Sequence, residues 1–450
     1  MYLLYSLLYT LAFLVLLPYF AYQAVFNRKY LGNFSGRLWL KSPWSKNESR
    51  PAIWLHAVSV GETLAAKPLI TALRERFPDH RLVVSTTTLT GQAVALENIR
   101  EADLICYFPF DWKFTVRHAL NVVQPKIVLL MESELWLNFL HECSIRQIPT
   151  VIVNGRISDR SFPRSQKFGL FVRWLYGLVT CFLMQSRVDA ERAVKLGAAS
   201  ERVFVCGNLK YDIEFADESP KLVEVANQLE KVLALSSSPL IVAGSTSEGE
   251  EKILFEAFSQ LRKFSRFEET RLLVAPRHPE RFGAVARLVE DSGFNLSRRS
   301  SFKKSDKKSE IILLDSVGEL AALYRFASLV FVGGSLVPIG GHNILEPAFF
   351  AKPIVVGPHM QNFRQITEEF LRRDAVIQIQ QTDSQEQTTN LSQIFAELLD
   401  DKTRARQLGE NARQAIGENR GATVRTVSAV ADLLSADKCP RSLKNQSLNG

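Results

Sequence analysis

Charged residues follow apolar, strand-like runs at several points of the chain, and Glu62 is the first of them. In parallel α/β folds, ligands bind beyond the carboxyl ends of the strands. Glu62 ends the stretch HAVSVGE (56–62) and falls in the first turn of an expected helix. A carboxylate there could act as a general base. It could also simply pair with the helix dipole, and taken alone the residue favours this second explanation.

Two further residues, Glu132 and Lys210, occupy similar positions. Glu132 ends the run KIVLLM (126–131), where a buried carboxylate is unfavourable without a partner or a function. Glu134, two residues later, could equally cap the next helix. Lys210 follows VFVC in the segment GNLK (207–210) and could stabilise developing negative charge. An ordinary surface lysine explains Lys210 equally simply and is preferred for that residue alone.

The second half of the chain carries glycine-rich and polar segments that together predict a nucleotide site. Glycines let the backbone approach a ligand, and free N–H groups at helix starts bind phosphate. Glu346, early in its helix, is placed to accept hydrogen bonds from sugar hydroxyls. The segments are PRHPER (276–281), SVGE (316–319), GGS (333–335) and GGHNILE (340–346).

The motifs of several other enzyme classes are missing from the sequence. It contains neither a Walker A loop nor a complete GxGxxG fingerprint, which disfavours a P-loop NTPase or an NAD enzyme. It contains no Asp-x-Asp pair, which disfavours an enzyme that holds a sugar nucleotide diphosphate through a metal ion. GxSxG and HExxH are also absent. We therefore expect no metal and no cofactor.

The elements that must position these residues follow an α/β pattern. Short apolar runs alternate with stretches of helical period, which is typical of parallel βαβ units. The pattern breaks near residues 212–238 and then restarts, so we expect two doubly wound domains with a cleft between them and a helical tail from Ser384. The expected strands are AIWLHAV (52–58), RLVVSTTT (81–88), ADLICYFPF (102–110), KIVLLME (126–132), TVIVNGR (150–156), FLMQS (182–186), VFVCGN (203–208), PLIVAGS (239–245), RLLVAPR (271–277), EIILLDS (310–316), SLVFVGGS (328–335) and PIVVGP (353–358).

The N-terminal segment predicts a membrane anchor. No residue from Tyr2 to Phe26 is charged, and a helix of this length exceeds the ~30 Å hydrocarbon core of a bilayer. A cleaved signal peptide is disfavoured, because no basic residue precedes the run and no small-x-small site follows it. Basic residues follow the run at once, which places the body of the protein in the cytoplasm. They could also contact anionic lipid.

The charge of the chain agrees with an anionic partner. The 450 residues carry a net charge of +8, and 46% of them are hydrophobic, so the chain can form sizeable cores. The basic residues are scattered and are not interleaved with aromatic residues, so nucleic acid is the weakest choice of partner. The anionic partners that remain are a membrane surface and a phosphorylated substrate.

Eight segments in order resemble the sequence blocks of 3-deoxy-D-manno-octulosonic acid (Kdo) transferases, and they span almost the whole chain. The segments are WLHAVSVGE (54–62), FPFDW (108–112), ESELWLN (132–138), NGRISDRS (154–161), GNLKYD (207–212), GSTSEGEE (244–251), PRHPERF (276–282) and GGSLVPIGGHNILEPA (333–348). The resemblance implies a GT-B fold. It also implies an inverting, metal-independent transfer of Kdo from CMP-Kdo to a lipid A precursor (lipid IVA) in lipopolysaccharide biosynthesis, at the cytoplasmic face of the inner membrane of a Gram-negative bacterium.

The resemblance also implies roles for individual residues. Glu62 matches the catalytic base, and Glu132 and Lys210 match the stabilisers of the transition state. Some family members have Met at the position of Val317, a change that a backbone contact would survive. The expected CMP contacts are Pro276, Arg277, Val317, Gly318, Glu319, Asn343, Ile344, Leu345 and Glu346.

The domain boundaries follow from the pattern and the resemblance together. We expect a membrane-anchor helix over residues 1–27, an acceptor-binding domain over 28–213 and a linker over 214–238. A CMP-sugar-binding domain with a helical tail is expected over 239–436, and disorder over 437–450. Two alternatives remain open: a GT-B transferase that uses another nucleotide sugar, and a non-catalytic protein that binds a nucleotide or a lipid.

Overall fold

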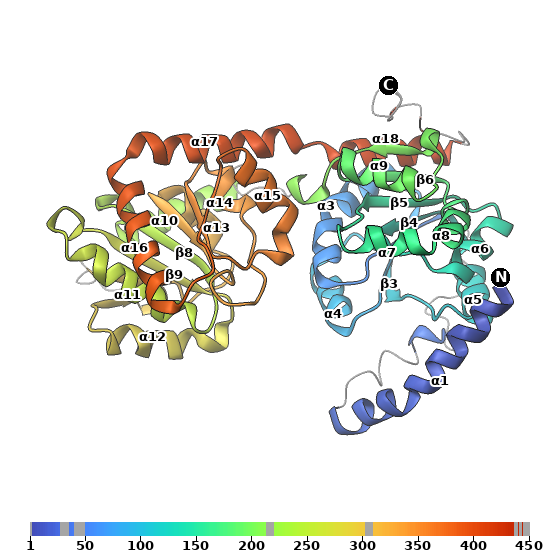
Figure 1. Cartoon of the computed structure of the whole chain (residues 1–450), viewed down its shortest axis with the longest axis horizontal. Coiled ribbons are helices and arrows are strands. Elements are labelled where there is room, and N and C mark those ends of the chain that lie inside the picture. Colours follow the sequence, from blue (N-terminus) through green and yellow to red (C-terminus); the bar gives the residue numbers. More distant parts are fainter. Residues whose placement is uncertain are drawn as a thin grey trace. The chain divides into compact units, whose positions relative to one another are not determined.

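The computed structural model describes residues 2–27, 36–39, 50–212, 220–301 and 309–435, together with Pro440 and Leu443. The chain forms two compact units (Figure 1). The first unit contains Met1–Ile213 and Asn419–Gly450, and the second contains Glu214–Glu418. The disorder expected over 437–450 falls outside the described residues except at Pro440 and Leu443, and Leu443 is buried in the core of the first unit.

The first unit is built on a parallel sheet of seven strands in the described part of the chain, in the order β3-β2-β1-β4-β5-β6-β7. The strand order reverses between β1 and β4, and this is the topological switch point at which such sheets bind ligands. The strands are β1 (Ala52–His56), β2 (Arg81–Thr86), β3 (Leu104–Tyr107), β4 (Pro125–Met131), β5 (Thr150–Gly155), β6 (Cys181–Met184) and β7 (Val203–Val205).

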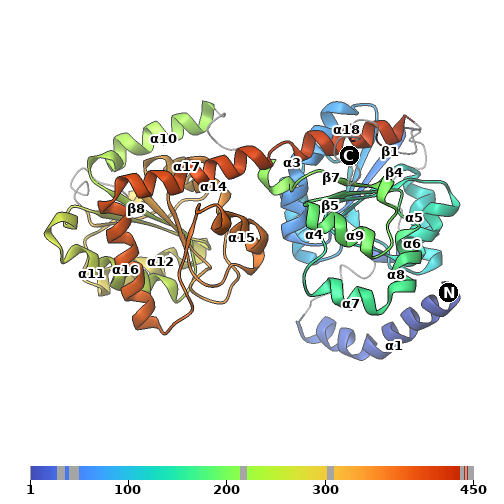
Figure 2. The same ribbon diagram turned by 45° about the horizontal axis from the view of Figure 1, so that its top comes forward.

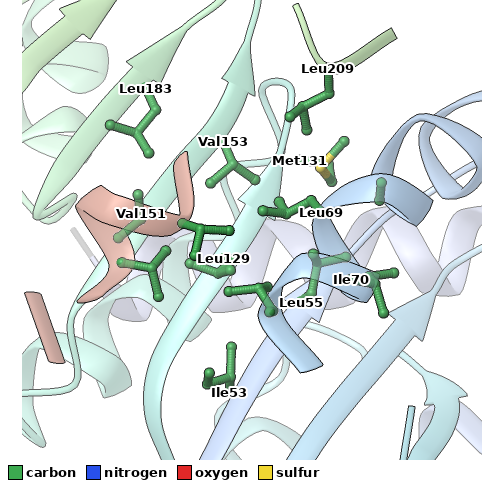
Figure 3. Close-up of a cluster of buried hydrophobic side chains, with 14 of the residues drawn as sticks. Ile53, Leu55, Leu69, Ile70, Leu129, Met131, Val151, Val153, Leu183 and Leu209 are labelled. Carbon is green, nitrogen blue, oxygen red and sulfur yellow. The ribbon is translucent and has the colours of Figure 1, made fainter. Parts of the chain in front are cut away.

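Helices cover both faces of this sheet, because successive side chains of a strand point to opposite faces. Ile53 and Leu55 pack beneath α3 (Val60–Arg76), α4 (Leu89–Asn98) and α18 (Ala422–Leu434), in the cluster drawn in Figure 3. Trp54 belongs to the opposite cluster. That face is covered by α5 (Lys113–Val123), α6 (Leu137–Ile145), α8 (Gly169–Tyr176) and α9 (Arg187–Lys195), and α7 (Ser161–Lys167) precedes α8.

The second unit repeats this architecture with another parallel sheet of seven strands, as far as the structure describes it, in the order β10-β11-β9-β8-β12-β13-β14. Its switch point lies between β8 and β12. The strands are β8 (Leu240–Thr246), β9 (Arg271–Pro276), β10 (Leu296–Arg298), β11 (Ile311–Leu313), β12 (Leu329–Val332), β13 (Ile354–Val356) and β14 (Ile377–Gln378).

One face of the second sheet packs against α11 (Glu250–Arg262), α12 (Phe282–Asp291) and α16 (Ser384–Asp400), as Figure 2 shows. The phenylalanines Phe255, Phe258 and Phe395 are buried there. Further α-helices are α10 (Pro220–Leu233), α13 (Leu320–Leu323), α14 (Leu345–Phe349), α15 (Arg364–Arg372) and α17 (Lys402–Asn419). Short 3₁₀ helices include η2 (Leu209–Asp212) and η6 (Pro279–Arg281).

The sequence-based prediction of two parallel α/β sheets is confirmed, and all twelve expected strands are present. The edge strands β10 and β14 were not predicted, because segments of three and two residues are too short to show an apolar pattern. The helical tail begins at Ser384, as expected.

The grouping of the last helix differs from the expected boundaries. We expected residues 239–436 in one domain, but α18 packs in the first unit, where Val427 and Val430 join the core cluster beneath α3. Asp212 fixes its start by accepting hydrogen bonds from the backbone N–H groups of Gly421, at 2.6 Å, and Thr423. The expected linker 214–238 likewise falls within the second unit, where α10 contributes buried side chains.

Helix α1 (Tyr2–Asn27) packs on the first unit through one of its faces. Tyr5 donates a hydrogen bond to the buried Asp111 carboxylate at 2.8 Å, and Trp112 Nε1 donates to the Thr10 hydroxyl at 3.1 Å. The ring of Phe13 packs edge-on against Trp112. Among the described side chains of α1, the large hydrophobic ones that are exposed are Leu4, Leu7, Leu8, Leu11, Leu14, Val15, Leu16 and Leu17.

Among the described residues, no helix is both long and apolar enough to cross a membrane. The expected membrane anchor therefore stays a prediction.

Candidate active site

Glu62 lies in the first turn of α3, directly beyond β1. Ser59 caps this helix, and its hydroxyl donates a hydrogen bond to Glu62 Oε1 at 3.0 Å. The backbone N–H of Val58 donates to Oε2 at 2.9 Å. The two contacts fix the carboxylate in a variant of the capping box. Burial raises the pKa of Glu62 to about 7, and the nearby Glu132 carboxylate adds to the rise.

Glu132 follows β4, the neighbour of β1 across the switch point. Its backbone has a φ of 55°, a left-handed conformation that is rare for residues other than glycine. The backbone N–H donates to Val153 O at 2.9 Å, which anchors the turn to β5. Such strain costs on the order of 1–3 kcal/mol and clusters at functional sites. The left-handed backbone places the Glu132 carboxylate where its charge acts on both Glu62 and Glu134.

Lys210 lies in η2, beyond the end of β7. The Asn154 side chain accepts a hydrogen bond from Leu209 N at 3.0 Å, and Asn208 Oδ1 accepts one from Lys210 N at 3.0 Å. These contacts set the position of the lysine backbone. Burial lowers the pKa of Lys210, while the charges of Glu132 and Glu62 oppose that shift. The structure thus brings the three predicted catalytic residues into one electrostatic cluster.

The predicted CMP contacts of the second unit follow strands of one sheet. Arg277 comes directly after β9 and is exposed, whereas Pro276 is buried. Asn343 Nδ2 donates to Glu346 Oε1 at 3.2 Å, and Asn343 Oδ1 accepts from Leu345 N at 3.0 Å. Burial raises the pKa of Glu346, and the positive charge of Arg277 partly offsets the rise. Arg277 therefore lies within electrostatic range of Glu346.

His342 belongs to the same group of residues. Burial lowers its pKa to about 4, and the positive charge of Arg277 lowers it further. His342 is therefore neutral at physiological pH. The side chains of Ile344 and Leu345 are completely buried, so only their backbone groups could contact a nucleotide.

The segment Val317–Glu319 follows β11, which pairs with β9. The Val317 side chain is 77% exposed, and Gly318 has a φ of 89°. Glu319 accepts hydrogen bonds from Arg299 Nε and Nη2, both at 3.0 Å. The segment shares the carboxyl edge of the sheet with Arg277.

Histidine, cysteine and acidic side chains do not gather into a possible metal site anywhere in the described ranges.

Comparison with known proteins identifies the family. The family model of the 3-deoxy-D-manno-octulosonic acid transferase (kdotransferase) matches residues 33–213. A 3-deoxy-D-manno-octulosonic acid transferase of Haemophilus influenzae is 33% identical over 382 residues, which cover 85% of this chain and 87% of that protein. One of Bordetella pertussis is 30% identical over 391 residues, with 85% and 87% covered. The chain belongs to the Kdo transferase family. The predicted family and the predicted enzyme class, a glycosyltransferase, are confirmed.

Solved structures of low sequence identity share the fold of this Kdo transferase. The UDP-GlcNAc 2-epimerase of Neisseria meningitidis has a TM-score of 0.58 at 12% identity, with 86% of this chain and all of that chain covered. A glycosyltransferase of Rickettsia africae has a TM-score of 0.55 at 14% identity, with 86% and 100% covered. These similarities concern the fold alone and agree with two parallel-sheet α/β units of GT-B type.

Sequence reasoning missed one cation of this electrostatic cluster, Arg156. Arg156 directly follows β5, and its positive charge lowers the pKa of Lys210. Its Nε is buried without a hydrogen-bond partner among the described residues. The signal was present in the sequence, since Arg156 ends the expected strand TVIVNGR and meets the same strand-end criterion as Glu62.

Proposed function

We propose that this enzyme transfers Kdo from CMP-Kdo to a lipid A precursor, lipid IVA, with release of CMP and inversion at the anomeric carbon. No metal ion takes part in the proposed reaction. The observation that carries the proposal is the environment of Glu62. A base works best when its pKa lies near the working pH, and burial raises the pKa of Glu62 to about 7.

In the proposed mechanism Glu62 accepts the proton of the acceptor hydroxyl as that oxygen attacks the anomeric carbon of Kdo. The hydrogen bonds from Val58 N and Ser59 Oγ hold the carboxylate in one orientation. Lys210 and Glu132 act on the charge that develops during transfer. Lys210 is suited to stabilise negative charge, because its ammonium group is partly removed from water.

The CMP donor is proposed to bind the second unit at the carboxyl edge of its sheet. Arg277 is an exposed cation at that edge and suits the phosphate. Glu346, fixed by Asn343, suits the ribose hydroxyls. The backbone of Ile344 and Leu345, together with the segment Val317–Glu319, supplies the remaining contacts. Departing CMP carries one phosphate, whose charge Arg277 can stabilise directly.

We further propose that α1 attaches the enzyme to the inner membrane as an N-terminal anchor, with both units on the cytoplasmic side. The support is the exposed apolar face of α1, where Leu7 and Val15 are 66% and 70% exposed. Leu7→Ser and Leu11→Ser together should reduce sedimentation with vesicles that contain phosphatidylglycerol. The variant Leu64→Ser, on an exposed leucine of α3, is the matched control.

The decisive experiment incubates the full-length enzyme with CMP-Kdo and a tetraacylated lipid A precursor, and measures CMP release and product mass. Glu62→Gln should lower the rate of transfer by at least about 100-fold, whereas Glu75→Gln, at the exposed end of the same helix, should retain it. A lipid that gains Kdo in a Glu62-dependent reaction supports the proposal.

Folded enzyme that binds CMP but transfers nothing would contradict the proposal and favour a non-catalytic binding protein. Thermal unfolding separates the alternative donors, since the proposed donor site predicts stabilisation by CMP and not by UDP.

A further inference from the structure

Two adjacent carboxylates, Glu250 and Glu251, begin α11 and are almost completely buried. Glu250 is 0% exposed and Glu251 is 1% exposed. They follow β8 at the switch point of the second unit, in the segment GSTSEGEE. A buried charge is strongly unfavourable unless hydrogen bonds or an opposite charge compensate it. The partners of each carboxylate therefore indicate what it holds in place.

Glu250 accepts four backbone hydrogen bonds. Oε1 accepts from Ser335 N and Leu336 N, both at 2.8 Å. Oε2 accepts from Gly334 N at 2.7 Å and from Ser247 N at 2.8 Å. Three of the donors are successive residues of the loop after β12, so one side chain orients the start of that loop. All four donors are N–H groups, and a side-chain amide nitrogen cannot accept from them.

The loop that Glu250 holds leads directly to the proposed donor residues. Gly341 N donates to Gly334 O at 2.7 Å, which closes the loop just before Asn343. Gly334 has a φ of 67°, and a Cβ atom there would lie 2.8 Å from the ring of His342. The loop therefore has little freedom, and its position relative to β8 depends on the Glu250 carboxylate.

Glu251 holds a second loop, the one after β9. Its two oxygens accept from Arg281 Nη1 at 2.6 Å and Nη2 at 3.1 Å, a bidentate pair. Oε1 also accepts from the Thr246 hydroxyl at 2.9 Å. Arg281 ends η6, four residues after Arg277. The backbone of Arg277 is joined to β8 as well, through its N–H to Thr246 O at 2.9 Å.

We propose that Glu250 and Glu251 are positioning residues for the donor, each fixing one of the two loops that carry the CMP-binding residues. Glu250 sets the loop that leads to Asn343 and Glu346, and Glu251 sets the loop that carries Arg277. The inference rests on the proposed donor site. It predicts that changes at either carboxylate weaken donor binding, although neither side chain contacts the nucleotide.

The test measures steady-state transfer by the full-length enzyme, with CMP-Kdo and the lipid acceptor varied separately. Glu250→Gln should raise the KM for CMP-Kdo by about 10- to 100-fold, because small displacements of binding groups have effects of this order. The KM for the lipid acceptor should stay within about twofold, since the acceptor residues lie in the other unit. Glu256→Gln, on the exposed side of α11, is the matched control.

Two milder variants keep the test decisive if Glu250→Gln does not fold. Arg281→Lys keeps the charge but loses the bidentate geometry, and should weaken CMP binding in calorimetry by about tenfold. Glu250→Asp keeps a carboxylate and should recover part of the donor affinity that Glu250→Gln loses. A purely structural role predicts that all variants lower the melting temperature without changing the KM for CMP-Kdo.

The outcomes also separate this inference from the proposed function. Wild-type enzyme that neither binds CMP nor transfers Kdo overturns the proposed function itself. Active wild-type enzyme, with Glu250→Gln and Arg281→Lys both matching Glu256→Gln in donor KM and CMP affinity, overturns only the positioning role.

Discussion

The two units place a glutamate at the same point of the same architecture, yet the two side chains are in opposite chemical situations. Glu62 and Glu250 each follow the first strand of a sheet, at the start of a helix beside the switch point. Glu62 accepts two hydrogen bonds and lies close to a second carboxylate, Glu132. Glu250 accepts four and is completely buried. The topology places the two glutamates at equivalent positions. They differ in the number of hydrogen-bond donors around each carboxylate.

Burial alone does not distinguish the two carboxylates, since it raises the pKa of both. The difference is whether the oxygens are free to take a proton. Every hydrogen bond that Glu250 accepts ties it to a loop of the protein, so protonation would break the structure around it. Glu62 has fewer such ties and can exchange a proton. We infer that Glu62 is suited to catalysis because the protein donates only two hydrogen bonds to its carboxylate in the described part of the chain.

The largest expected effect is on turnover. Glu62→Gln should lower kcat by about 10²- to 10⁴-fold, the usual contribution of a general base. CMP affinity in calorimetry should be unchanged, because the proposed donor site lies in the other unit. If Glu62→Gln retained more than a tenth of the wild-type kcat, Glu62 would not be the general base. The contrast drawn with Glu250 would then be wrong.

The second prediction concerns the free energy of unfolding, which a change at Glu250 should lower and a change at Glu62 should not. Glu250→Gln should lower the free energy of unfolding by about 3 kcal/mol, because buried N–H donors lose a charged acceptor. Glu62→Gln should have the opposite effect above pH 7. The pKa of Glu62 is raised from 4.5 to about 7 in the folded state, so its ionisation destabilises the fold as the pH rises through that interval.

Chemical denaturation of both variants at pH 5 and pH 8 checks this prediction. The advantage of Glu62→Gln over wild type should be larger at pH 8. Equal changes for the two variants at both values would show that the carboxylates do not differ as described.

The third prediction is the pH dependence of kcat/KM. A base must be deprotonated to act, so activity should rise with pH through a midpoint near 7, where Glu62 ionises. Below that midpoint the rate should fall about tenfold per pH unit. Initial rates between pH 5.5 and 8.5, at saturating CMP-Kdo and an acceptor concentration well below its KM, measure the profile of kcat/KM for the acceptor. A rate that stays constant down to pH 5.5 would contradict the raised pKa of Glu62 as the control of the rate.

The smallest predicted effect is a shift of the pH midpoint in a Glu132 variant. Its negative charge contributes to the raised pKa of Glu62, so Glu132→Gln should move the midpoint of the profile to lower pH. The residual activity of this variant, followed over the same pH range, shows the shift. An upward movement of the midpoint would contradict the proposed interaction between the two carboxylates.

The positions of Glu62, Glu132 and Lys210 could be predicted from sequence, because polar residues directly after apolar runs fall on one edge of a parallel sheet. The partners of Glu250 could not. Its three loop donors lie 84 to 86 residues further along the chain, and no local pattern indicates which turn accepts which side chain. The same holds for the pairing of Glu251 with Arg281.

The sequence also could not predict which of the two units α18 joins. An amphipathic helix shows that one face is buried but not which core buries it. Its place in the first unit depends on Asp212, which lies 209 residues before Gly421 and caps the start of the helix.

The placement of α18 has a consequence for synthesis on the ribosome. The second unit is one continuous stretch, so it has all of its residues as soon as Glu418 has emerged. Most of the first unit is translated earlier, yet its hydrophobic core stays open until Val427, Val430 and Leu433 follow. The half of the enzyme that holds Glu62 is therefore completed last, only after the proposed donor-binding half has been made.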